Sequence, residues 1–158
     1  MLRTLLLVAV LASAALAGET TRTETVGLRF AVPAAWTRVP ASYGEAILFF
    51  FGAGKGGGAA ENLERWYAQL TPADGRPARD AAVVTMRTVR ALRVTAVDLA
   101  GAYRAAPSGV AKPGFRLLAA VIEGPGGPWF LKAVGPEATV ARARDGFEAL
   151  LASLEAHR

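Results

Sequence analysis

Two spacings of apolar residues, every second position and every third or fourth, divide most of this chain into strands and helices. From Val26 to Val32, apolar residues alternate with polar or small ones, which predicts a half-buried strand that ends at Pro33. The run EAILFFF, residues 45–51, is continuous and aromatic, as in a strand covered on both faces. The first two predicted elements are therefore strands.

Two segments have the spacing of a helix. Between residues 59 and 70, apolar residues recur at i, i+3, i+4 and i+7: Leu63, Trp66, Tyr67 and Leu70. Near the C-terminus, Gly135 can cap a helix, Pro136 suits its first position and Glu137 complements its positive end. The second stripe consists of Val140, Ala143, Phe147, Leu150, Leu151 and Leu154.

Four further strands are predicted between these helices, at residues 83–90, 93–103, 115–123 and 129–134. The first two form a hairpin that turns near Ala91 and Leu92, and GPGGP turns the chain before the fourth. The order is β-β-α-β-β-β-β-α. Because consecutive strands favour an antiparallel sheet, we expect an α+β fold of about five to six strands with helices packed on its faces. The strand count near residues 36–45 stays open.

The N-terminal residues have the pattern of a signal peptide. Arg3 precedes an apolar run, and small residues end in the A-x-A motif of Ala15 to Ala17, so we expect cleavage of residues 1–17. Residues 18–158 then form a single domain that is exported, to the periplasm or the medium. No later apolar run is long enough to span a membrane, so we expect no transmembrane segment after cleavage.

The amino-acid composition excludes several classes of functional site. The chain has no cysteine, which excludes thiol catalysis and thiolate metal sites. Its net charge is +5, but the basic residues are scattered and lack interleaved aromatics, so we expect no nucleic-acid partner. The densest basic cluster is Arg87, Arg90 and Arg93. It predicts either the solvated rim of a hairpin or a surface that contacts an anionic partner.

The glycine-rich segment FFFGAGKGGGAAENLERW resembles a phosphate loop between a strand and a helix. It lacks the hydroxyl residue that follows lysine in a Walker A motif, because Gly56 follows Lys55. Gly52, Gly54 and Gly57 match G-x-G-x-x-G, but a dinucleotide fold needs a second parallel strand after the helix, and TPADGRP stands there instead. We therefore interpret the segment first as a connector.

The alternative is a weak anion or ligand loop in which consecutive amides form a nest beside one lysine. Its residues would be Gly54, Lys55, Gly56, Gly57 and Gly58.

Catalytic groups are sparse. The sole histidine, His157, is expected to fray with the terminus, and no serine lies in a nucleophile motif. Asp98 lies in an apolar strand, where we expect it to point outward and pair with an arginine, the alternative being a carboxylate site. Lys132 is expected to be solvated. The aromatics Trp66, Tyr67, Trp129 and Phe130 indicate a core before a ligand cleft. We expect no catalytic residue, cofactor or metal.

A resemblance to known proteins rests on three segments: GGPWFLKAVGPEATVARARDGFEALLASL, FFFGAGKGGGAAENLERWYAQL and VTAVDLAGAY. They are similar to a group of small exported bacterial proteins of unknown function, whose architecture resembles the fold of the PsbP and Mog proteins. The resemblance implies an antiparallel sheet with helices on its faces, and a binding or accessory role. It supplies no site residue.

Together these patterns predict an exported, soluble, non-catalytic domain that binds a partner protein, an envelope component or a small ligand. The alternatives are anion binding at the loop Gly52–Gly58 and a carboxylate-based enzyme.

Overall fold

A computed structural model describes residues 21–25, 27–34, 36 and 46–157 of the chain. The strands are β1 (Thr21–Thr25), β2 (Leu28–Val32), β3 (Ala46–Phe49), β4 (Leu70–Thr71), β5 (Val83–Val89), β6 (Leu92–Tyr103), β7 (Lys112–Glu123), β8 (Trp129–Pro136) and β9 (Glu155–Ala156). The helices are α1 (Ala59–Tyr67), α2 (Ala78–Ala81) and α3 (Glu137–Ala152). The predicted signal peptide lies outside the described residues.

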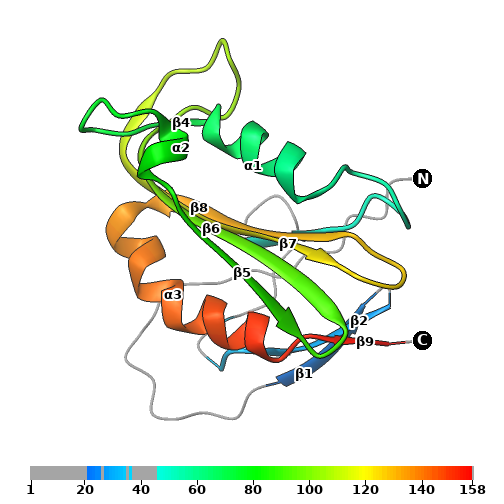
Figure 1. The fold of residues 1–158 in the computed structure, drawn as a ribbon. Coiled ribbons are helices and arrows are strands. Elements are labelled where there is room, and N and C mark those ends of the chain that lie inside the picture. Colours follow the sequence, from blue (N-terminus) through cyan, green and yellow to red (C-terminus); the bar gives the residue numbers. More distant parts are fainter. Residues whose placement is uncertain (1–20, 26, 35, 37–45, 158) are drawn as a thin grey trace.

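Six strands form the main sheet (Figure 1). Its order is β3-β8-β7-β6, and both β4 and β5 pair with β6 on the far side. A second, small sheet has the order β1-β2-β9. All the pairings among described strands are antiparallel. After α1 the chain enters β4, at the opposite side of the sheet from β3, so it does not make the parallel unit of a dinucleotide fold.

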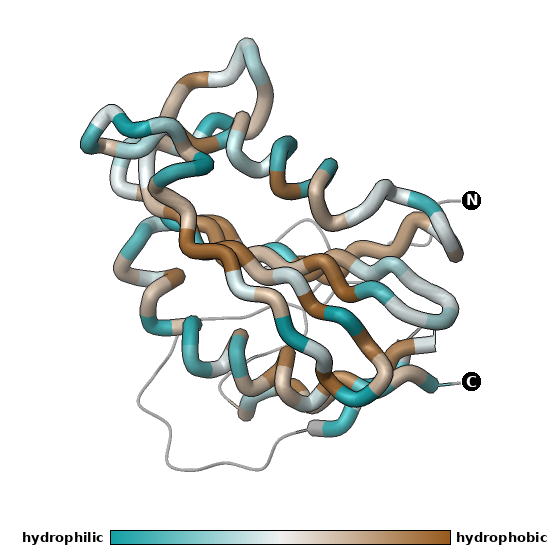
Figure 2. The backbone as a smooth tube through the Cα atoms, in the orientation of Figure 1, coloured by the Kyte–Doolittle hydropathy of each residue, from teal (hydrophilic) through white to brown (hydrophobic). Residues whose placement is uncertain are grey.

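The main sheet has an apolar core on each face. Side chains alternate along a strand, so Val94, Leu118 and Leu131 face α3 and the small sheet, while Val97, Leu117 and Phe130 face α1. Figure 2 shows the hydrophobic residues gathered along the strands between these two helices. Trp66 of α1 and Phe147 of α3 are both buried. The helices therefore cover opposite faces of one antiparallel sheet, which confirms the predicted α+β class.

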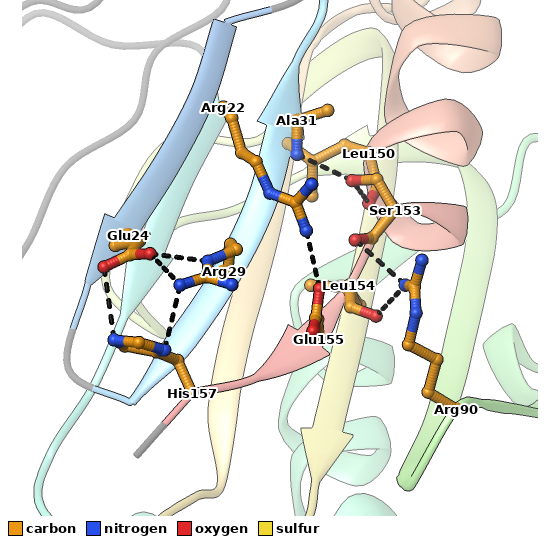
Figure 3. Close-up of polar contacts among 10 residues, drawn as sticks. All are labelled: Arg22, Glu24, Arg29, Ala31, Arg90, Leu150, Ser153, Leu154, Glu155 and His157. Atoms are coloured by element: carbon orange, nitrogen blue, oxygen red, sulfur yellow. Dashed lines mark hydrogen bonds and ion pairs between the residues drawn. The ribbon is translucent and has the colours of Figure 1, made fainter.

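One end of each main helix is fixed by hydrogen bonds to a polar side chain. Glu61 in the first turn of α1 accepts a hydrogen bond from the amide of Gly58, at 3.0 Å, and so caps the helix. On the other face of the main sheet, Ser153 follows α3. Its hydroxyl donates to the carbonyl of Leu150 and accepts from the amide of Ala31, both at 2.7 Å (Figure 3). Ser153 thus joins the end of α3 to β2.

Several details differ from the sequence-based expectations. The strands β1, β4 and β9 are additional to those predicted, and α2 is an additional short helix. The hairpin turns at Arg90 and Ala91, one residue earlier than predicted, because Leu92 is fully buried at the start of β6. The final helix begins at Glu137, with Pro136 as its N-cap. Trp36 packs against the α3 core, and residues 37–45 lie outside the described part of the chain.

No helix among the described residues is long and apolar enough to cross a bilayer.

Candidate functional site

Several polar groups of the glycine loop before α1 already form hydrogen bonds with other residues of the protein. The amide of Gly54 donates to the carbonyl of Gly127 at 2.8 Å, and the amide of Gly58 donates to the Glu61 carboxylate. The side chain of Asn62, which is buried, donates to the carbonyls of Gly56 and Gly58. A carboxylate therefore already occupies the start of α1, where an anion would be expected to bind.

Packing explains two of the glycines. Gly56 has a φ of +94°, and a Cβ there would lie 2.7 Å from the ring of Phe130. Gly57 has a φ of +81°, and a Cβ there would collide with the Glu61 carboxylate. Only glycine fits such close approaches at positive φ. Lys55 is exposed, and it makes no ion pair with any described residue. The anion-loop hypothesis stays a prediction, centred on this lysine.

The three arginines of the predicted interaction surface do not form one patch. Arg87 lies 2.8 Å from Glu148 of α3, as an ion pair without hydrogen-bond geometry. Arg90 donates to the carbonyls of Ser153 and Leu154 at the end of α3 (Figure 3). Arg93 lies on the opposite face of the sheet from Arg87 and bonds Glu123. Each guanidinium instead contacts its own separate partner within the fold.

Asp98 is paired with arginine, as expected, but it points inward. Its side chain is only 11% exposed on the α3 face. Arg116 binds it through two hydrogen bonds of 2.7 and 2.8 Å, and Arg144 of α3 lies 2.8 Å from the same carboxylate. The bond to Asp98 raises the pKa of Arg116. The adjoining hollow holds about 30 Å³, which is room for one water and not for a substrate.

His157 is held by the small sheet, and the expectation that it frays was wrong. Its amide donates to the carbonyl of Gly27 at 2.8 Å. Its ring lies between two charged side chains, with Nδ1 3.0 Å from Arg29 and Nε2 3.3 Å from Glu24 (Figure 3). The pairing of β2 with β9 brings these residues together.

Lys132 is half-buried, contrary to the sequence-based expectation that it is solvated. It lies on β8 between Ala119 of β7 and Ile47 of β3, on the face covered by α1. Its Nζ donates to Oε1 of Gln69 at 2.6 Å and lies 5.5 Å from the centre of the Tyr103 ring. Burial lowers the pKa of Lys132 to about 8. This strand tolerates lysine because the amide oxygen and the ring replace water around it.

A pocket of about 600 Å³ opens at the C-terminal end of α1. It is lined by Arg65 and Gln69, by Thr71 of β4, and by the start of the β6–β7 loop at residues 104–107. Gln69 lines this pocket and also accepts the hydrogen bond from Lys132. The residues come together because Leu70 pairs with Tyr103 and the carbonyl of Gln69 accepts from the amide of Arg104 at 2.8 Å.

The edge strand β5 is another open feature of the fold. Within the described part of the chain it pairs only with β6 (Figure 1). Three of its apolar side chains are exposed: Val83 at 57%, Val84 at 39% and Met86 at 78%. Free edges are usually protected by charged side chains. Arg87 is the one charged residue of β5, and it forms an ion pair with Glu148 of α3 instead of protecting the edge.

Neither feature has a clear signal in the sequence. Gln69, Arg104 and Lys132 are far apart in the chain, and the only available signal was an ionisable residue within the apolar run WFLKAV. The pattern of β5 predicts a strand, but it does not say which of its faces another element covers.

Comparison with protein-family models finds no match to this chain, and a search of curated proteins finds no match either.

Proposed function

We propose that this chain is an exported, non-catalytic binding protein of the cell envelope, which binds a partner protein along the free edge of β5. The export part rests on the signal-peptide pattern of residues 1–17. The binding part rests on one observation, the exposed apolar edge of β5. A role in binding also agrees with the resemblance to exported proteins with a PsbP-like or Mog-like sheet.

An extended segment of the partner adds one strand to the main sheet. The backbone N–H and C=O groups on the outer side of β5 supply the hydrogen bonds, and side chains at alternate positions supply selectivity. Val84 and Met86 point to the face of α1, since they pair with Val97 and Thr95, while Val83 points to the other face. The partner segment therefore carries apolar side chains at every second position. The net charge of the full chain is +5, and removal of Arg3 with residues 1–17 leaves +4, which favours acidic flanks.

The test compares two exposed apolar residues of the same kind. Met86→Asp places a charge on the β5 edge, and Val110→Asp places one in the β6–β7 loop, where Val110 is 86% exposed. The partner is first identified by cross-linking to the exported protein in its native envelope, and its affinity is then measured with purified components. Met86→Asp should weaken binding at least about tenfold, or ~1.4 kcal/mol, while Val110→Asp leaves binding unchanged.

Equal affinity of the wild-type protein and Met86→Asp would show that β5 is not the binding edge. A second copy of the chain is the competing occupant, and light scattering distinguishes it. A wild-type dimer that Met86→Asp converts to a monomer would assign the edge to self-association and overturn the proposal of a different partner.

A further inference from the structure

The pocket at the C-terminal end of α1, here called the α1 pocket, has an unusual balance of charge. Its lining contains two arginines, Arg65 and Arg104, and no acidic residue. Several exposed arginines elsewhere in the fold pair with carboxylates, such as Arg79 with Glu64 at 2.7 Å. Neither arginine of the pocket forms an ion pair with a residue that the structure describes. The pocket is therefore a concave surface with positive charge and no internal counter-ion.

Most hydrogen-bond donors of these arginines are unused. Arg104 donates from Nη1 to the carbonyl of Pro107 at 3.4 Å, and Arg65 donates from Nη1 to the carbonyl of Gly56 at 3.2 Å. Arg65 Nη1 also lies 3.4 Å from the Asn62 side-chain oxygen. A guanidinium has five N–H donors. Arg65 directs its guanidinium to Gly56 and Asn62, which do not line the pocket, whereas Arg104 bonds Pro107 of the pocket wall. Arg104 therefore retains donors for an anion there, and its planar group matches a carboxylate.

Lys132 fixes which end of the Gln69 amide is available to the pocket. A protonated lysine only donates, so the oxygen of the amide must face it, as the 2.6 Å bond shows. The nitrogen of the same amide, with two N–H donors, has no partner among the described residues and belongs to a side chain that lines the pocket. Burial holds the pKa of Lys132 near 8, so the ammonium persists at neutral pH.

The remaining wall of the α1 pocket is apolar. Ala68, Ala105, Ala106 and Pro107 contribute it. A ligand that fits has an anionic end for Arg104 and a short hydrocarbon body for this wall.

From this geometry we propose that the α1 pocket binds a small organic carboxylate. Arg104 holds the carboxylate, the Gln69 amide nitrogen donates to it, and Lys132 is a positioning residue that orients Gln69. This site is separate from the edge of β5 and goes beyond the proposed function, because it assigns a small-molecule ligand to a second surface.

The proposal is tested by nuclear magnetic resonance titration of the purified protein with butyrate, succinate and inorganic phosphate. A carboxylate should shift the side-chain amide signal of Gln69, with a dissociation constant of about 1 mM or tighter. Arg104→Gln should weaken this binding about tenfold. Arg142→Gln is the matched control, since Arg142 is an exposed arginine of α3 outside the pocket, and it should leave the affinity unchanged.

Lys132→Met provides an independent readout. In this variant the Gln69 amide signal should shift even without ligand, and carboxylate binding should weaken. The proposal is overturned if neither carboxylate shifts the Gln69 signal at 10 mM, if phosphate alone does so, or if Arg104→Gln and Arg142→Gln bind alike. Backbone spectra of each variant establish that the fold is retained.

Discussion

Replacing Asp98 with alanine should destabilise the fold more than replacing any exposed acid. Asp98 of β6 is the common partner of Arg116 on β7 and Arg144 on α3, through contacts of 2.7 to 2.8 Å. It therefore joins two strands and the helix that covers them. Asp98→Ala removes the carboxylate and leaves both guanidinium groups without it.

The size of the effect follows from how well water can replace the lost partner. Breaking a fully buried ion pair by removing one member costs about 3–5 kcal/mol. The side chain of Arg144 is 47% exposed and rehydrates readily, whereas that of Arg116 is only 21% exposed. The carboxylate of Glu137 lies 3.9 Å from Arg116 and replaces part of the lost interaction. We therefore expect a loss of about 2–3 kcal/mol in the free energy of unfolding.

Urea unfolding followed by tryptophan fluorescence measures this loss, because Trp66 and Trp129 are buried and report on opposite faces of the sheet. The midpoint should fall with little change in slope, and the melting temperature should drop by roughly 6–9 °C. The matched control is Asp80→Ala, since Asp80 is exposed and its carboxylate makes no ion pair with a described residue. That variant should lose less than about 0.5 kcal/mol. Equal losses in the two variants would refute the role assigned to Asp98.

Three further predictions concern single side chains. Ser153→Ala should cost about 1–2 kcal/mol, since it leaves a β2 amide without its acceptor; faster hydrogen exchange at that amide checks the cause. Gly56→Ala should cost about 2–3 kcal/mol because its Cβ would meet Phe130, whereas Gly54→Ala, at positive φ in open space, should cost about 1 kcal/mol; thermal unfolding compares them. The pKa of Lys132 is about 8 in the folded protein and 10.5 in the unfolded chain. Between pH 8 and pH 10.5, the unfolded chain therefore keeps a proton on Lys132 that the folded protein has lost. The wild-type protein should therefore gain stability relative to Lys132→Met as pH rises from 8 to 9.5, by up to ~2 kcal/mol, and a flat difference would contradict this.

Local sequence patterns predicted the main elements because those elements bury one continuous stripe or face. The apolar spacing of α1 and α3 and the alternation along β2 each have one solution that buries the apolar residues. The antiparallel arrangement followed from the order of the strands. The short strands β4 and β9 have no such signal, since two residues cannot show a period. They form because Tyr103 and Leu28 present free backbone groups to Leu70 and Ala156.

The candidate sites were harder to predict because they depend on which charges meet. The spacing of Arg87, Arg90 and Arg93 indicated one surface, but alternation along the hairpin places Arg87 and Arg93 on opposite faces. Lys132 was expected in water because it alternates out of the core face of WFLKAV, but the other face of β8 is also covered, by α1. Its acceptor, Gln69, follows a helix that packs over β8 from a distant part of the chain.

The central claim, that the edge of β5 receives a strand from a partner, is tested most directly by hydrogen–deuterium exchange on the purified complex. Partner binding should protect amides of Val83–Val89 and leave the loop around Val110 unchanged. Unchanged exchange throughout β5 at saturating partner would contradict the claim.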